Sequence, residues 1–315
     1  MPSGETNFHQ VQYLTIDADH AGRRVDNFLF SFLKNVPKGR IYKMLRKGEV
    51  RVNKKRVSAN YRLAQNDNLR IPPVFLEVRS KPRIPYRVVE RLETSVLYED
   101  DTLLIINKPS GIPVHAGSGC EYGVIEAIRT MPKYTEISIE LVHRLDRETS
   151  GCLILAKKPT ILRYLNRLSR DNQIEKHYRT LVKGSWKGGP VMVDAPLLKN
   201  VLRGGERIVK VCEEGKDAYT QFTPVQQFSN STLLDVDLYT GRTHQIRVHA
   251  AHLGQPIAGD SKYGASDFNK EMKNLGLSRL FLHASQVSFA LTEKKYVHVE
   301  APLPEELQRI LDKLS

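Results

Sequence analysis

The hydrophobic positions of the N-terminal quarter first recur at helical spacing and then alternate. Between residues 21 and 45 the apolar side chains fall three and four positions apart, which predicts two helices that Pro37 separates and Gly48 ends. Residues 49–53 alternate in the manner of a strand, and a turn at 53–55 follows. The pattern predicts a small module of two helices and a short sheet.

The chain beyond residue 92 reads as a strand-rich domain with helices between the strands. A helix is predicted over 160–170 with Thr160 as its N-cap, and another begins at a Thr243 cap and stops at Gly254. The predicted strands are 96–99, 103–106, 152–156, 175–182 and 232–239. The first two are predicted to form a hairpin that turns at the aspartate pair between them.

Pro72, Pro73, Pro82 and Pro85 lie among charged residues and mark 74–91 as a semi-rigid basic linker. The linker divides the 315 residues into an N-terminal tail at 1–20, a small α+β domain at 21–73 and a larger domain at 92–315. We therefore predict an α+β protein of two domains.

Positive charge is concentrated in the small domain. The chain has a net charge of +13, and between residues 23 and 62 thirteen Lys or Arg side chains face only two acidic ones, a local net of 13 − 2 = +11. So dense a patch of one sign predicts a polyanionic partner such as nucleic acid.

Several other function classes are disfavoured. No apolar run approaches the roughly 18 residues that cross a membrane, and the N-terminus is polar, so we expect a cytoplasmic protein. The histidines within 244–252 diverge around a helix, which argues against a metal site. The three cysteines are too few and too widely spaced for a disulfide framework or a zinc site and are expected to be small buried residues: Cys120, Cys152 and Cys212.

Residues 142–151 place a polar segment, Val-His-Arg-Leu-Asp-Arg-Glu-Thr-Ser-Gly, directly before the apolar run 152–156. Asp146 stands between Arg144 and Arg147. In an extended chain Arg144 and Asp146 would share one face, and the cation would keep the carboxylate ionised near neutral pH. Such a carboxylate suits a nucleophile or a base, although a salt-bridged turn without chemistry explains the same residues.

The segment resembles the catalytic motif His-Arg-Leu-Asp-x-x-Thr-Ser-Gly of the RluA-type RNA pseudouridine synthases and matches it at every fixed position. The resemblance implies that Asp146 is the catalytic residue. The later Gly-Arg-Thr-His-Gln-x-Arg-x-His block implies that Arg242 pairs with Asp146, and Lys-x-Tyr implies that Tyr178 contacts the target base while Lys176 supports the site.

Other blocks extend the resemblance over most of the chain. Residues 279–284 resemble the family's final motif, which implies that Leu282 packs near the site, and Arg144 is expected to hold the flipped nucleotide. Residues 107–111 also match and are expected to form a structural turn. The fold implied is a mixed, mostly antiparallel sheet flanked by helices, with the site in a cleft across its middle.

The basic module resembles the S4 RNA-binding domain in Arg24-Val25-Asp26-x-Phe28-Leu29 and Arg46-Lys47-Gly48-x-Val50-x-Val52-Asn53. The alternative is a solvated basic face that binds nothing. The residues expected to contact RNA are Lys38, Arg40, Lys43, Arg46, Lys47, Arg51, Asn53, Lys54, Lys55 and Arg56.

The resemblance is closest to subgroup C of the large-subunit ribosomal RNA synthases. It implies an isomerase that needs no cofactor or metal, acts on ribosomal RNA and works as a monomer, through attack on C1′ or through a glycal. Two alternatives stay open: a non-catalytic RNA-binding or ribosome-assembly protein that uses the basic module alone, and a hydrolase with an aspartate nucleophile.

Overall fold

The computed structural model describes residues 10–33, 36–74, 84–117, 120–203 and 206–315. The chain separates into two units that meet between Pro82 and Arg83 in the sequence, and each is described by itself. No helix among the described residues is long and apolar enough to cross a membrane.

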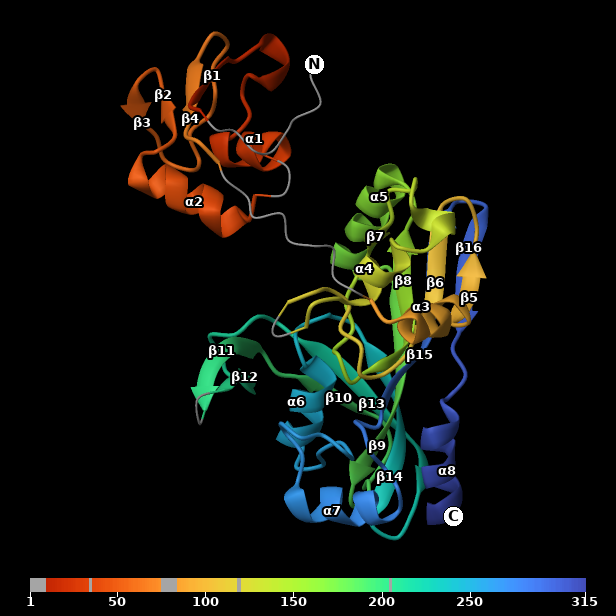
Figure 1. The fold of residues 1–315 in the computed structure, drawn as a ribbon. Coiled ribbons are helices and arrows are strands. Elements are labelled where there is room, and N and C mark those ends of the chain that lie inside the picture. The colour runs from red at the N-terminus through yellow and green to blue at the C-terminus, as the bar shows by residue number, and fades with distance from the viewer. Residues whose placement is uncertain (1–9, 34–35, 75–83, 118–119, 204–205) are drawn as a thin grey trace. The chain divides into compact units, whose positions relative to one another are not determined.

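The first unit packs two helices on a four-stranded antiparallel sheet of order β1-β4-β2-β3 (Figure 1). As the periodicity predicted, side chains such as Phe28, Leu29, Ile41 and Met44 form its core. The elements are β1 (Gln12–Thr15), a 3-10 turn (Ala18–His20), α1 (Val25–Phe32), α2 (Lys38–Lys47), β2 (Arg51–Val52), β3 (Lys55–Arg56) and β4 (Asn68–Ile71).

Turn chemistry in this unit follows the sequence, whereas its N-terminal boundary does not. Gly48 ends α2 in the left-handed conformation with φ 70°, and Asn53 and Lys54 adopt φ 50° and 66° in the turn between β2 and β3. The prediction that residues 1–20 form a tail outside the domain is wrong for the second half of that range, because β1 pairs with β4 along four residues. Four residues are too few to show a period, and residues 1–9 lie outside the described part.

The second unit is built on a ten-stranded sheet, and the prediction of a mixed, mostly antiparallel sheet is confirmed. The main path runs β10-β13-β14-β9-β15-β8-β6-β5, with β16 on β15 and β7 on β8. Only the pairing of β8 with β15 is parallel among the described strands. The strands are β5 (Val96–Glu99), β6 (Leu103–Lys108), β7 (Glu140–Leu141), β8 (Ser150–Ala156), β9 (Glu175–Lys183), β10 (Val191–Asp194), β13 (Tyr219–Gln227), β14 (Ser231–Leu238), β15 (Leu282–Thr292) and β16 (Lys295–Glu300).

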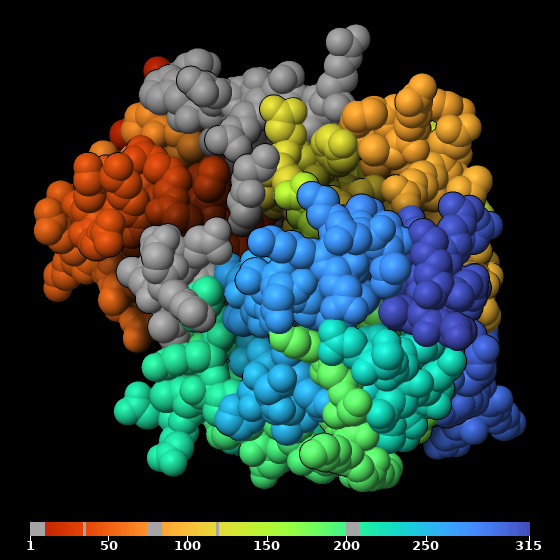
Figure 2. All heavy atoms as spheres, turned by 90° about the horizontal axis from the view of Figure 1, so that it is seen from below, coloured from red at the N-terminus to blue at the C-terminus, as the bar shows by residue number. Residues whose placement is uncertain are grey.

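Helices cover both faces of this sheet, because alternate residues of its strands are apolar on both sides. On β6, Leu104 and Ile106 pack with α3, α4 and α6, whereas Leu103 and Ile105 pack on the face that α5 covers. Helices α7 and α8 share a further cluster and lie side by side at the surface, light and dark blue in Figure 2. The helices are α3 (Tyr86–Glu93), α4 (Val124–Ile128), a 3-10 turn (Pro132–Tyr134), α5 (Pro159–Arg170), α6 (Gln245–His252), α7 (Ser266–Asn274) and α8 (Glu305–Leu314).

A two-stranded hairpin, β11 (Leu197–Arg203) and β12 (Glu206–Val211), forms a separate sheet and projects away from the main one (Figure 1). Its base packs on α6 through a small cluster that includes Val209 and Val248.

The structure corrects several boundaries. The C-terminal part of the predicted linker 74–91 is the helix α3, whose Leu92 enters the core, while residues 75–83 lie outside the described part. Helix α5 begins at Pro159, so Thr160 is not its N-cap, because proline suits the first helical position. The N-cap of α6 is His244 rather than the predicted Thr243.

The predicted hairpin of β5 and β6 is confirmed. Of the cysteines, Cys152 is buried, whereas Cys120 and Cys212 are only half-buried, so the expectation of three buried residues is wrong for two of them.

Gly151 lets β8 approach β15 where the two strands pair in parallel. It has φ 111°, and a Cβ at this position would overlap the backbone of Ala284, including its carbonyl oxygen. We predict that Gly151→Ala lowers the free energy of unfolding by about 3 kcal/mol, from overlap and left-handed strain together. Urea unfolding followed by circular dichroism measures this. Gly188→Ala is the matched control, because it has φ 86° but open space around it, and an equal loss in both variants would contradict the overlap.

Candidate active site

The loop that carries Asp146 connects β7 to β8 and is hydrogen-bonded to the turn at 108–112. Lys108 is fully buried, and its Nζ donates to the carbonyls of Pro109 at 2.8 Å, Ile112 at 2.9 Å and Arg147 at 3.2 Å. Burial lowers the pKa of Lys108 to about 7. These bonds give residues 107–111 the structural role that the sequence predicted.

Asp146 lies in a pocket at the middle of the sheet. Tyr178 of β9 and Leu282 of β15, both predicted site residues, line it from neighbouring strands. The loop before α6 and the first turn of that helix close the opposite wall. The lining residues are Arg144, Leu145, Asp146, Thr149, Tyr178, Leu238, Gly241, Arg242, Thr243, His244, Gln245, Ile246, Arg247 and Leu282.

The cation paired with Asp146 is Arg247, which corrects the prediction that Arg242 takes this place. Arg247 Nη1 lies 3.4 Å from Asp146 Oδ2, whereas Arg242 is exposed and its Nε donates to the carbonyl of Asp217 at 3.0 Å. The position at which α6 begins explains why Arg247, and not Arg242, reaches Asp146. Its first turn carries Arg247, and side chains of a helix point back toward its N-terminus.

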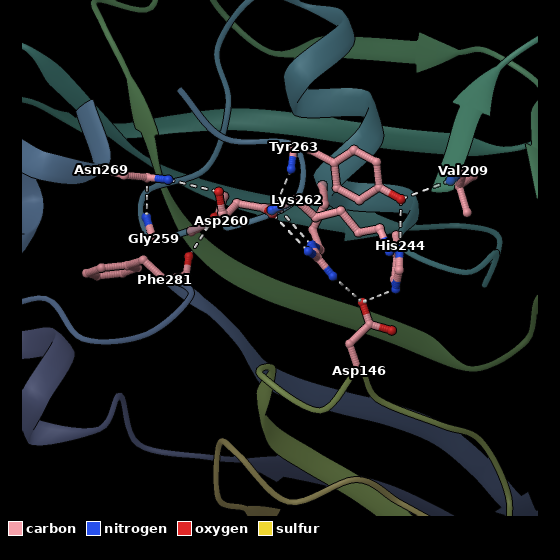
Figure 3. A network of polar contacts seen from close by, with 11 residues as sticks. Asp146, Val209, His244, Gly259, Asp260, Lys262, Tyr263, Asn269 and Phe281 are labelled. Carbon is pink, nitrogen blue, oxygen red and sulfur yellow. Dashed lines mark hydrogen bonds and ion pairs between the residues drawn. The ribbon is translucent and has the colours of Figure 1, made fainter. Parts of the chain in front are cut away.

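Arg247 is itself fixed by a buried carboxylate. Its Nε and Nη2 donate to Asp260 Oδ2 and Oδ1 at 2.7 and 2.8 Å, and the backbone N–H groups of Lys262 and Tyr263 also donate to Asp260 (Figure 3). Burial opposes both charges, but their mutual bonds prevail: the pKa of Asp260 is lowered and that of Arg247 is raised. The cation therefore reaches Asp146 already oriented.

His244 is the second group on Asp146. It has φ 54°, an uncommon conformation for a residue with a side chain, and its Nε2 lies 3.8 Å from Asp146 Oδ2. Its Nδ1 lies 2.8 Å from the hydroxyl of Tyr263. Burial lowers the pKa of His244, which favours the neutral ring near pH 7.

Sequence reasoning missed four residues of this network. Arg247 and His244 belong to the Gly-Arg-Thr-His-Gln-x-Arg-x-His motif at 241–249 but were not singled out, and Asp260 and Tyr263 belong to no motif that the sequence analysis identified. Among the residues that the structure describes, no group of three His, Cys, Asp or Glu is placed to hold a metal ion.

The remaining predicted residues differ in position. Tyr178 is buried, and burial together with the charge of Asp146 raises its pKa, so the phenol stays neutral. Arg144 is exposed at the rim, and within the described part it is Arg247, not Arg144, that pairs with Asp146, because residues 144–146 form no strand. Lys176 is half-buried, burial lowers its pKa, and it lies outside the pocket lining.

Comparison with known proteins identifies the family. The family described as RNA pseudouridylate synthase matches residues 102–252, and the S4 domain matches residues 23–69. The chain is 47% identical over 317 residues to the ribosomal large subunit pseudouridine synthase C of Haemophilus ducreyi (strain 35000HP), covering 100% of this chain and 99% of the relative. The chain belongs to the RNA pseudouridine synthase family. The protein is accordingly an enzyme, an isomerase.

Other similarities agree. The synthase is 46% identical over 315 residues to the ribosomal large subunit pseudouridine synthase C of Escherichia coli (strain K12), which covers 98% of both chains. Among solved structures it is similar to Human RNA Pseudouridylate Synthase Domain Containing 4, with a TM-score of 0.61 and 25% identity over 72% of this chain and 95% of that one. These similarities disfavour the non-catalytic alternative.

The S4 domain of the synthase presents a basic surface. The five predicted cations of α2 are exposed, and so are those of β2, β3 and the turn between them. Asn53 differs, because its amide donates to Asp67 at 2.7 Å and its Oδ1 accepts the N–H of Asn68, so it joins β2 to β4. Its expected RNA contact competes with this structural role.

Proposed function

We propose that the synthase isomerises uridines of large-subunit ribosomal RNA and that Asp146 is its catalytic residue. The observation that carries the proposal is one carboxylate in a pocket at the centre of the sheet, paired with a cation that a second, buried carboxylate orients. The relatives named as ribosomal large subunit pseudouridine synthases support the choice of RNA.

The reaction breaks the bond between N1 of uracil and C1′ of ribose, turns the base and joins its C5 to C1′. Asp146 acts at the sugar, either by attack on C1′ or by removing the proton from C2′. Both routes need an ionised carboxylate, and Arg247 places a cation 3.4 Å from Asp146 Oδ2.

The target nucleotide must leave its stack to reach Asp146, which costs a few kcal/mol unless it lies in a loop. We assign to Arg144, at the rim of the pocket, the role of holding the flipped nucleotide, and to Tyr178 and Leu282 contact with the base. Because its phenol is neutral, Tyr178 is assigned to contact with the base, and the C5 proton is lost to solvent. The exposed Arg242 is assigned to RNA backbone, and Lys176 to support of the site from outside the pocket.

Release of tritium from RNA labelled at C5 of uridine tests the activity directly, because that proton is lost when C5 bonds to C1′. A binding protein would release none, and a hydrolase would liberate uracil or phosphate. Mapping pseudouridines in ribosomal RNA from cells without the gene identifies the sites. We further propose that the enzyme acts as a monomer in the bacterial cytoplasm, and light scattering in solution tests the oligomeric state.

The S4 domain should supply salt-dependent affinity for RNA. We expect the triple variant Lys43→Gln, Arg46→Gln, Lys47→Gln to reduce the slope of log Kd against log salt by about one for each phosphate that the variant no longer neutralises. Filter binding over a series of salt concentrations measures this. The matched control neutralises three exposed lysines of the catalytic unit: Lys187, Lys270 and Lys294. Equal slopes for the two triple variants would contradict a role of α2 in RNA binding.

A further inference from the structure

A chain of polar contacts runs from the projecting hairpin to the candidate catalytic carboxylate (Figure 3). The backbone N–H of Val209 in β12 donates to the hydroxyl oxygen of Tyr263 at 3.0 Å. The hydroxyl lies 2.8 Å from His244 Nδ1, and His244 Nε2 faces Asp146 at 3.8 Å.

The contacts of the two ring nitrogens favour one tautomer of His244. The Tyr263 oxygen already accepts from Val209, so its own hydrogen is free to be donated, and His244 Nδ1 is the acceptor beside it. With Nδ1 accepting, the neutral ring carries its proton on Nε2. That N–H then points at Asp146 Oδ2.

Charges of both signs surround His244. Asp146 and Asp260 favour its protonation, Arg247 and Lys262 oppose it, and burial, the largest influence, lowers its pKa. The geometry and the charges together describe a neutral donor rather than an imidazolium.

Both donors converge on the same oxygen of Asp146. Arg247 Nη1 donates to Oδ2 at 3.4 Å, and His244 Nε2 faces the same oxygen at 3.8 Å, which is longer than a hydrogen bond. In the described part of the chain Oδ1 has no hydrogen-bond or ion-pair partner. In Figure 3 the second carboxylate oxygen of Asp146 points away from the contacts drawn.

We propose that His244 is a positioning residue, held as the Nε2–H tautomer by Tyr263, that together with Arg247 fixes Oδ2 of Asp146 and leaves Oδ1 to meet the ribose. This inference rests on the proposed role of Asp146.

The tautomer can be measured without any activity. In protein labelled with ¹⁵N-histidine, NMR at neutral pH should show a ring protonated at Nε2 that disappears in His244→Gln. In Tyr263→Phe, which keeps the ring packed on Arg247 and removes only the hydroxyl, this resonance should move toward the Nδ1–H form or an exchanging mixture. A His244 protonated on Nδ1 in the unaltered protein would overturn the proposal even if the enzyme is fully active.

Two substitutions at His244 separate its donor from its backbone role. Glutamine extends an amide N–H to about the place of Nε2, whereas asparagine reaches only the place of Nδ1. Asparagine accepts the left-handed backbone more readily than glutamine, so backbone strain predicts the opposite order. We expect His244→Gln to keep kcat within about threefold and His244→Asn to lose about tenfold to a hundredfold, both with unchanged Kd for RNA. Equal activity in the two variants would overturn the donor role.

The pH profile provides a readout that a purely structural role would not move. A hydroxyl that donates to Nδ1 favours the neutral ring, so its loss raises the pKa of His244. In Tyr263→Phe the acid limb of kcat should therefore move to higher pH by about one unit. An unmoved limb would overturn the link to Tyr263, whereas an unaltered enzyme that releases no tritium would instead refute the proposed function.

Discussion

Asp146→Asn is expected to lower isomerisation by at least about 10⁴-fold while leaving RNA affinity almost unchanged. Asparagine has nearly the same shape, but it lacks the charge that either route of the mechanism requires. Its amide can still fill the pocket between Arg247 and His244, so folding and RNA binding should persist. Tritium release under single-turnover conditions and a binding assay on the same RNA measure the two quantities separately.

The control for this variant is Asp101→Asn, which removes a carboxylate from an exposed turn far from the pocket lining. It should behave as the unaltered enzyme. Turnover by Asp146→Asn above the level of an RNA-only blank would contradict the catalytic role of Asp146, whereas loss of RNA binding would show that the charge serves recognition.

Arg247→Met is expected to have the second largest effect, on stability as well as on rate. It leaves the buried carboxylate of Asp260 unpaired, and breaking a buried pair from one side costs about 3–5 kcal/mol. Isomerisation should also fall by about a hundredfold or more, because Asp146 loses its cation. Urea unfolding and single-turnover kinetics measure the two losses.

The stability loss should depend on pH in a defined direction. Arg247 holds the pKa of Asp260 below its usual value, so the pair stabilises the fold above about pH 4, the range in which an unfolded aspartate is ionised. That stabilisation is lost as the pH falls through the folded-state pKa. The difference between Arg247→Met and the unaltered enzyme should therefore be largest near neutral pH and shrink in acid.

Arg242→Gln is the matched control, since it removes a guanidinium from the same loop region without touching Asp146. We expect little change in stability, a rate constant near normal and weaker RNA binding. If Arg242→Gln instead lowered kcat as much as Arg247→Met, the assignment of the two arginines would have to be exchanged.

Local sequence was sufficient for the residues that lie close together along the chain. The segment 142–151 indicated Asp146 because its charged residues are contiguous and precede a buried strand. The Tyr178 and Leu282 predictions relied on resemblance, and the structure places both side chains in the pocket that Asp146 occupies. Their catalytic roles remain proposals.

The partner of Asp146 could not be predicted in the same way. Arg242 and Arg247 stand five positions apart in one motif, and choosing between them requires the direction of each side chain. That direction follows from a helix that begins at Gln245, one residue after His244 in its left-handed conformation. Asp260, which orients Arg247, is distant in sequence from both.

The sequence by itself determined the α+β class, the basic N-terminal module, four of the eight α-helices in the described part of the chain, several of the strands, and the carboxylate at the centre of the proposed chemistry. These features depend on periodicity, charge density and turn residues over a few positions, which are physical consequences of burial and backbone geometry. Only the tertiary structure decided that β1 completes the small sheet, that α3 is a helix, and that Arg247, oriented by Asp260, meets Asp146 together with His244. Such contacts depend on the pairing of strands that are remote in sequence. Hydrophobic and charge patterns over a few positions do not indicate this pairing.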